Sequence, residues 1–287
     1  MRHAYLIIVH NEFEILSRLI MALDDSRNDI YIHFDRKLIE CPSVETKNAG
    51  LFILKNRVDV RWGDISVVKA EYALFKEAFQ RGKYAYFHLL SGVDLPLKSQ
   101  DEIHKFFAEH AGKEFIGFSQ YDYTEEVDRK VRRIHLFAKY FRSTGSLADM
   151  ARKVVRAAFL RIQFLLHIRI NKQELFKKGT QWISVTENFV RYLLSEKHEV
   201  LSMYRNTFCS DEIFAQTLCW NSIFRERIYN LEDEAKGCMR KIGWRDGQLF
   251  DWTNADYDEL MQADAVYARK FNSANMDVVE KIASRVI

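Results

Sequence analysis

The sequence predicts an α/β protein built around a mainly parallel sheet that is flanked by helices. Short apolar runs alternate with amphipathic helical patterns over the first 120 residues, a pattern typical of parallel sheets. Polar side chains directly follow several of these runs, at the sheet edge where α/β proteins bind ligands. Because 48% of the 287 residues are hydrophobic and no linker is visible, we expect one domain, 1–287, with a large core.

The expected strands are short, apolar and rich in β-branched residues. They cover 4–9, 29–34, 51–54, 84–90, 114–118 and 180–185. The expected helices repeat apolar residues on one face. They cover 12–25, 65–82, 99–112, 186–196 and 210–222.

Residue types at the helix starts predict their caps. Ser99 is followed three residues later by Glu102, which is the signature of a capping box. Thr186 is the expected cap of its helix, and Ser210 or Asp211 the expected cap of the next.

The region 120–175 is basic and predicts a helical insertion of unassigned role. Its apolar stretch 154–170 carries Arg156, Arg161 and Arg169, so it does not indicate a membrane span. Two interpretations remain open. One is an amphipathic helix that packs on the core, and the other is a basic helix that lies on a membrane surface.

Charge and motifs exclude several classes of protein. The chain has 43 basic and 40 acidic residues, a balance that does not indicate nucleic-acid binding. GxGxxG, P-loop, HExxH and GxSxG motifs are absent. The N-terminus is not typical of a signal peptide. The four cysteines lack metal-binding spacing, so we expect free thiols in a reducing cytoplasm.

Polar residues end three of the expected strands. His10 follows the first strand, Asp35 the second and Asp94 the fourth. Singly, a histidine there is more often structural, and an aspartate often forms a turn. Together at one sheet edge they indicate a ligand site.

Seven sequence blocks occur in a characteristic order between residues 5 and 271. They are YLIIVHNEFEILSRLIMAL, YIHFDRK, VRWGDISVVKAEYALFKEA, YFHLLSGVDLPLKS, KGTQWISVTENFVRYLL, SDEIFAQTL and VYARKF. This ordered set resembles the core-2/I-branching family of glycosyltransferases, which includes β-1,6-N-acetylglucosaminyltransferases and peptide O-xylosyltransferases. Residues 120–175 do not resemble any block of this family.

The resemblance implies a GT-A-type fold and an inverting transfer from a UDP-sugar, with GlcNAc as the expected sugar and no metal. The general base of the family is the glutamate of a Pro-Asp-Glu block, which matches Ser210-Asp211-Glu212 here. Glu212 is therefore the expected base. Serine replaces proline, and both residues are common at helix starts. A purely structural interpretation is that Asp211 and Glu212 only offset the helix dipole.

Cations that would stabilise the leaving diphosphate also follow from the resemblance. The matching positions are Arg240 and Lys270, with Arg245 and Arg269 as nearby substitutes because the spacing differs. Without the resemblance, each would be interpreted as a surface charge. The one DxD sequence, Asp256-Tyr257-Asp258, lies far from the position of a metal-binding DxD, and we interpret it as solvated surface.

The remaining predicted site residues surround the nucleotide and the sugar. Val9, His10 and Asp35 match positions that contact uridine in the family. Three further residues are expected at the sugar or in the pocket wall: Trp62, Asp94 and Trp182.

The animal enzymes have a membrane anchor and disulfides, which are not recognised here, so we expect a bacterial, cytoplasmic relative. The expected acceptor is a glycan or lipid-linked glycan of surface polysaccharide synthesis, and peripheral membrane association through 154–170 stays open. Three further interpretations also stay open. They are the same fold with UDP-xylose or another donor, a non-catalytic nucleotide-sugar or glycan-binding subunit, and a membrane-surface adaptor.

Overall fold

A five-stranded sheet in the order β3-β2-β1-β4-β6 forms the centre of the computed structural model, which describes residues 1–287. Its strands are β1 (His3–Val9), β2 (Asn28–Phe34), β3 (Gly50–Ile53), β4 (Tyr86–Ser91) and β6 (Ser184–Thr186). The first four are parallel, and β6 is antiparallel to β4. The predicted mainly parallel sheet is therefore confirmed, with one antiparallel edge strand.

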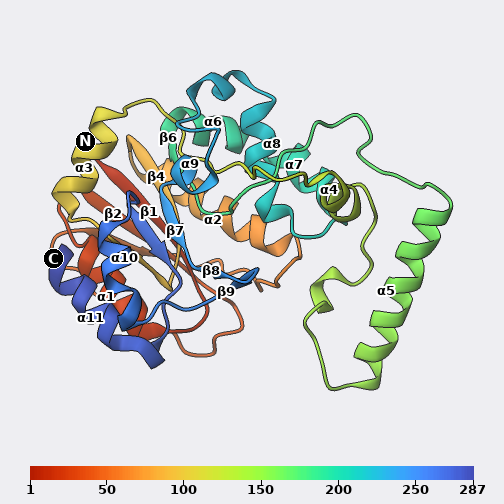
Figure 1. Cartoon of the computed structure of the whole chain (residues 1–287), viewed down its shortest axis with the longest axis horizontal. Helices are drawn as coiled ribbons and strands as arrows, with labels where there is room; N and C mark the ends of the chain where they lie inside the picture. Colours follow the sequence, from red (N-terminus) through yellow and green to blue (C-terminus); the bar gives the residue numbers. More distant parts are fainter.

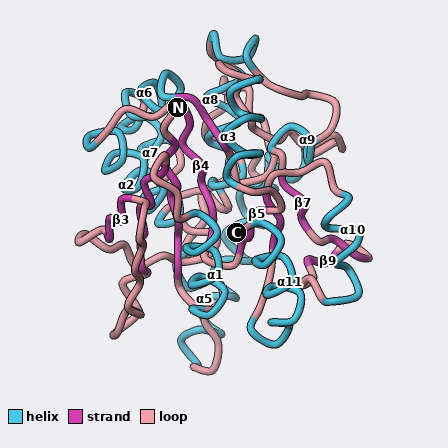
Figure 2. The backbone as a smooth tube through the Cα atoms, turned by 90° about the vertical axis from the view of Figure 1, so that its left-hand side faces the viewer, coloured by secondary structure: helices cyan, strands magenta, loops and turns pink.

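Helices cover both faces of this sheet (Figure 1, Figure 2). The α-helices of the whole chain are α1 (Phe13–Leu23), α2 (Ser66–Arg81), α3 (Gln100–Glu109), α4 (Thr124–Val131), α5 (Leu147–Leu165), α6 (Glu187–Ser195), α7 (Lys197–Met203), α8 (Phe214–Trp220), α9 (Glu234–Cys238), α10 (Tyr257–Gln262) and α11 (Met276–Val286).

Alternation along β1 assigns its side chains to two hydrophobic layers. Leu6 and Ile8 pack in the cluster that includes α2, whereas Tyr5, Ile7 and Val9 pack in the cluster that includes α1 and α11. Successive side chains of a strand point to opposite faces, so a strand buried on both faces is apolar throughout. This explains why β1 is an uninterrupted apolar run.

A second, three-stranded sheet lies beyond the carboxyl end of β4. Its strands are β5 (Asp94–Pro96), β10 (Tyr267–Arg269) and β7 (Arg240–Ile242), in that order. A short hairpin of β8 (Trp244–Arg245) and β9 (Gln248–Leu249) follows β7. The chain thus brings its C-terminal third back to the sheet edge where the early strands end.

Two sequence predictions in this region are wrong. Residues 114–118 form no strand, because Glu114 and Phe115 each make one isolated bridge, to Ile228 and Ser184. The segment 210–222 is not one capped helix. Residues Ser210–Glu212 form a 3₁₀ turn, and α8 then begins at Phe214 without a side-chain cap.

The predicted caps of two other helices are confirmed. Ser99 and Glu102 form a reciprocal capping box at the start of α3, and Thr186 accepts the Phe189 N–H at the start of α6. Both caps depend on a few adjacent residues, which is why the local sequence predicts them.

The predicted helical insertion contains α4 and α5, and α5 stands apart from the rest of the molecule (Figure 1). Of its 19 residues, only Asp149 and Gln163 are buried. The interpretation of 154–170 as a helix that packs on the core is therefore wrong. Neither α5 nor any other helix combines the length and the hydropathy that a transmembrane helix requires.

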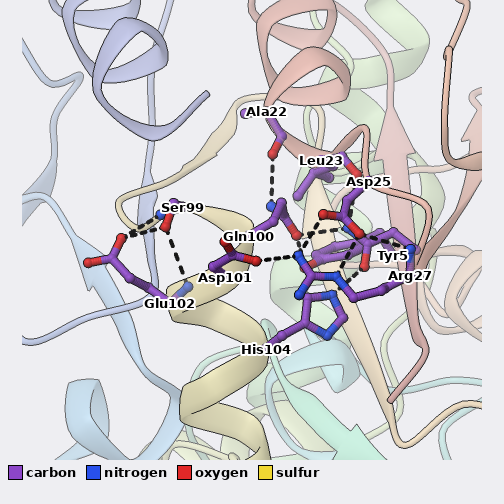
Figure 3. A network of polar contacts seen from close by, with 11 residues as sticks. Tyr5, Ala22, Leu23, Asp25, Arg27, Ser99, Gln100, Asp101, Glu102 and His104 are labelled. Carbon is purple, nitrogen blue, oxygen red and sulfur yellow. Dashed lines mark hydrogen bonds and ion pairs between the residues drawn. The ribbon is translucent and has the colours of Figure 1, made fainter.

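A partly buried polar network joins α3 to the amino ends of the strands, on the side of the sheet opposite their carboxyl ends (Figure 3). The Gln100 amide donates to Ala22 O (2.8 Å) and accepts from Asn28 Nδ2 (2.8 Å). Arg27 bonds Asp25 and, at 2.8 Å, Asp101. Because these side chains satisfy one another, the network serves stability.

Acid should destabilise the protein in part through His104 in this network. His104 stacks on His3 (4.0 Å between ring centroids) and bonds Asn28 Oδ1 through Nε2 (2.9 Å). Burial, followed by the charge of Arg27, lowers the pKa of His104 to about 4 from its ordinary 6.5. Between these values the unfolded chain binds a proton that the folded chain does not, so stability falls as the pH falls from 6.5 to 4.

We therefore expect His104→Gln to lose less unfolding free energy between pH 7 and pH 4 than the wild type, by about 1–2 kcal/mol after allowance for solvent screening. Urea unfolding across this pH range measures the difference. His198→Gln is the control, because the side chain of His198 is 92% exposed. Equal pH slopes for His104→Gln and wild type would contradict the assignment.

Candidate active site

A cavity of about 1220 Å³ opens where the carboxyl ends of β1 and β4 meet the second sheet. The segment after β1, the strands β7 and β10, the hairpin β8–β9 and the insertion helix α4 all contribute to its lining. This is the edge at which α/β sheets bind ligands. Six of the nine predicted site residues line it: His10, Trp62, Trp182, Glu212, Arg240 and Lys270.

Glu212 lies in one wall of the cavity between two lysines. Lys130 Nζ is 3.1 Å and Lys178 Nζ 3.8 Å from Glu212 Oε2. Burial alone would lower the pKa of Lys130, but Glu212 and Glu126 lie beside its ammonium group and raise it. The pKa of Lys178 is also raised, despite burial, so both lysines are charged where they pair with Glu212, whose side chain is 37% exposed.

Two further carboxyl groups lie behind Glu212. Asp211 is buried, its Oδ1 has no hydrogen-bond partner, and burial together with the Glu212 carboxylate raises its pKa above the ordinary value. Glu71 is fully buried, and burial raises its pKa well above the ordinary value. Burial therefore disfavours the charged form of both of these carboxyl groups, and Glu212 is the most exposed of the three.

A close backbone contact fixes the position of Glu212. Its carbonyl oxygen accepts the Gly179 N–H (2.9 Å). A Cβ atom on Gly179 would lie 1.9 Å from the Gly117 carbonyl oxygen, so only glycine fits there. The packing of these two glycine backbones therefore holds Lys178 and Glu212 in one wall.

Arg269 and Lys270 bring positive charge to the cavity from the end of β10. Lys270 Nζ pairs with Asp251 Oδ1 (3.1 Å). The Arg269 guanidinium pairs with Asp94 Oδ1 (3.2 Å) and stacks on Trp182, 4.2 Å from the ring centroid. Of the two substitute cations, Arg269 thus lines the cavity beside Lys270, whereas Arg245 pairs with Asp256 outside it.

Arg240 lines the cavity but uses most of its donors within the protein. Its guanidinium donates to Ile183 O (2.9 Å), to Ser184 Oγ (2.8 Å) and to Cys238 O, and it stacks on Tyr267. Its Nε is buried without a partner. Arg240 therefore joins β7 to β6 and adds positive charge to the cavity wall.

Three predicted residues do not reach the cavity lining. Val9 is buried against Gly92. Asp35 is buried and pairs with Lys37 Nζ (2.7 Å). Asp94 accepts from the backbone N–H (2.9 Å) and hydroxyl (2.8 Å) of Ser91. They shape the turns that carry the lining residues.

Two predicted aromatic side chains do line the cavity. Trp62 is 43% exposed, and Arg142 of the insertion stacks on it at 4.1 Å. Trp182 is buried beneath Arg269. Trp62 is therefore the more accessible of the two rings.

The interpretation of Asp256-Tyr257-Asp258 as solvated surface is wrong for its first residue. Asp256 is buried, forms a capping box with Thr253 and bonds Arg245, while Asp258 is exposed. The two carboxylates therefore do not face a common space, and the sequence pattern does not form a metal-binding pair.

Sequence reasoning missed the residues that surround Glu212. Glu126 and Lys130 come from α4, in the unassigned region, and Lys178 comes from the segment before β6. The spacing of Glu126 and Lys130 by four residues indicates a helical ion pair. Nothing in the local sequence indicates that this pair meets Glu212.

Comparison with known proteins identifies relatives over nearly the whole chain. A sequence profile described as Core-2/I-Branching enzyme matches residues 3–274. Human xylosyltransferase 2 is 20% identical over 303 aligned residues, which cover 97% of this chain and 33% of that protein. Human N-acetyllactosaminide beta-1,6-N-acetylglucosaminyl-transferase is 21% identical over 300 residues, covering 93% of this chain and 67% of that protein.

The chain thus spans about a third of the length of xylosyltransferase 2. The matched residues run from β1 through the end of β10 and include every strand that borders the cavity. The cavity and its lining therefore lie within the region shared with these proteins, and the chain belongs to the Core-2/I-Branching enzyme family.

Proposed function

We propose that this protein is an inverting glycosyltransferase of GT-A type that moves a sugar from a UDP-sugar to a glycan hydroxyl. The observation that carries the proposal is the cavity itself. It places a carboxylate, Glu212, in one wall and the cations Arg269 and Lys270 in another. A base for an acceptor and cations for a diphosphate are the two parts that such a transfer requires.

Glu212 acts as the general base in this proposal. Its carboxylate accepts the proton of the acceptor hydroxyl as that oxygen bonds to the anomeric carbon. The bond from that carbon to the diphosphate oxygen breaks on the opposite face, so the configuration inverts and UDP leaves with the electron pair. Lys130 and Lys178 hold the Glu212 carboxylate in place for this step.

Arg269 and Lys270 stabilise the negative charge that grows on the leaving UDP. A guanidinium bonds two phosphate oxygens at once, whereas an ammonium group acts as a point charge. Arg240 strengthens the positive potential of the cavity wall. We propose that these cations take the place of a divalent metal ion, since Asp256 is already bonded to Thr253 and Arg245.

The names of the relatives suggest two donor sugars, xylose and N-acetylglucosamine. We propose UDP-GlcNAc as the donor and a glycan or lipid-linked glycan as the acceptor. His10 and the exposed face of Trp62 are the proposed contacts of the nucleotide and the sugar. UDP-xylose is the comparison substrate in the turnover assays.

Replacing the base should slow the reaction while leaving the donor bound. We expect Glu212→Gln to lower turnover about 10²–10⁴-fold, the usual loss for a general base. The affinity for UDP should stay within about twofold, because Glu212 does not contact the diphosphate in this proposal. UDP release from UDP-GlcNAc, with a glycan acceptor or with water, measures the effect.

Glu125→Gln is the matched control. Glu125 lies on α4 beside Glu126, but its side chain is exposed and does not line the cavity. It should turn over at the wild-type rate. Turnover of Glu212→Gln within a few-fold of wild type would remove Glu212 from the mechanism.

Binding of UDP should depend on Arg269 and Lys270 and not on a metal ion. We expect the same calorimetric dissociation constant for UDP with and without excess EDTA. Lys270→Met should weaken UDP binding about 10–100-fold, the typical value of a charge-assisted hydrogen bond. Added Mn²⁺ should not restore binding.

Lys241→Met is the control, because the Lys241 ammonium pairs with Glu259 (2.8 Å) outside the cavity lining. It should bind UDP like wild type. Arg240→Met should lose both UDP affinity and unfolding free energy, because its guanidinium also joins β7 to β6. Loss of UDP binding in EDTA, with recovery in Mn²⁺, would overturn the proposed metal-free mechanism.

A further inference from the structure

Helix α5 presents its apolar side to solvent and its polar side to the protein. Leu147, Val154 and Leu165 are 84%, 68% and 78% exposed. Helical spacing places them on one face together with three other exposed residues: Ala151, Ala158 and Ile162. Leu166 and Ile168 extend the apolar surface just beyond the helix. We call these eight residues the outer stripe.

The opposite face of α5 is held by specific polar contacts. The Gln163 side chain accepts from the Ile134 N–H and donates to the Ile134 carbonyl, each at 2.9 Å. Asp149 is buried and bonds Ser146 and Arg152 (2.8 Å each). The Asp149 bonds lie within α5 and its cap, whereas the Gln163–Ile134 bonds join the helix to another segment and set its rotation, so the exposure of the outer stripe is a built feature of the fold.

The charges around the outer stripe are basic. Between Arg142 and Lys172 there are seven lysines and arginines, and Asp149 is the one acid. Asp149 is buried on the inner face, whereas Lys153 and Arg161 are exposed beside the stripe. A contiguous exposed apolar surface marks an interaction site. Here the partner must accept apolar side chains and carry negative charge.

We propose that the outer stripe binds the surface of an anionic phospholipid bilayer, with α5 lying in the interface plane. An amphipathic helix with basic residues flanking its apolar face is suited to this position. A second copy of the chain fits less well. Pairing two outer stripes would bring Lys153 and Arg161 against the same cations, with no exposed acid on α5 to offset them.

Aromatic contacts connect α5 to the rim of the cavity. Arg156, on the inner face of α5, stacks on Phe141 at 4.3 Å. Phe141 in turn contacts Trp62 (5.3 Å between centroids), which lines the cavity. Binding of α5 to a bilayer would hold the cavity rim near the lipid surface. That consequence suits an acceptor carried on lipid, and it alone rests on the proposed function.

Co-sedimentation of the full-length chain with vesicles tests the proposal. We expect binding to vesicles of phosphatidylcholine that contain phosphatidylglycerol, and much weaker binding to pure phosphatidylcholine or at high salt. Lys153→Glu with Arg161→Glu should weaken binding at least about 25-fold, at about fivefold per basic charge lost. Val154→Asp with Leu165→Asp should weaken it at least about tenfold through lost apolar burial.

Matched controls change the same residue types elsewhere on the surface. Ile39→Asp with Ile223→Asp alters side chains that are 97% and 75% exposed, and Lys69→Glu with Arg205→Glu alters exposed cations. Both control variants should bind vesicles like wild type. All variants should keep the wild-type melting temperature and UDP affinity, so a vesicle defect is separable from a folding or site defect.

Two results would overturn the proposal. One is the absence of vesicle binding by the wild type at low salt. The other is a dimer in lipid-free sedimentation equilibrium that Val154→Asp with Leu165→Asp dissociates, which would assign the outer stripe to a second copy of the chain.

Discussion

Two arginines, the buried Arg240 and the largely buried Arg269, join the two sheets, and the cavity depends on this junction. Arg269 in β10 pairs with Asp94 in β5 and stacks on Trp182, which precedes β6. Arg240 in β7 donates to Ile183 and Ser184 at the edge of the central sheet. A buried guanidinium is costly unless its donors are bonded, so each arginine strongly favours the one arrangement that satisfies it.

This junction also explains why the site gathers distant parts of the sequence. The carboxyl ends of β1 and β4 form one side of the cavity, the second sheet forms another, and α4 closes it near Glu212. Glu212 itself lies between Lys130, which comes from α4 of the insertion, and Lys178, which comes from the segment between the insertion and β6. The insertion is thus part of the cavity wall through α4, while α5 extends away from it. Helix α4 contributes to the cavity, and α5 provides the proposed contact with the bilayer.

The sequence predicts the central sheet well because burial on both faces leaves a local signal. β1, β2 and β4 are fully buried and mostly apolar, and the Ser99–Glu102 box marks α3 through four adjacent residues. Prediction failed where contacts outside the segment itself determine the structure. Residues 114–118 look like a strand but make only isolated bridges, and Asp256 looks solvated but is buried by Thr253 and Arg245. Periodicity also detects an apolar helix face without telling which way it points, as α5 shows.

Thermal unfolding in the presence of a panel of nucleotides tests whether the cavity between the two sheets is a UDP-sugar site. A ligand at a hundred times its dissociation constant stabilises the folded state by about 2.7 kcal/mol. We predict that UDP and UDP-GlcNAc raise the melting temperature in EDTA, and that ADP, GDP and CDP do not. No shift with any uridine nucleotide, or equal shifts with all nucleotides, would contradict it.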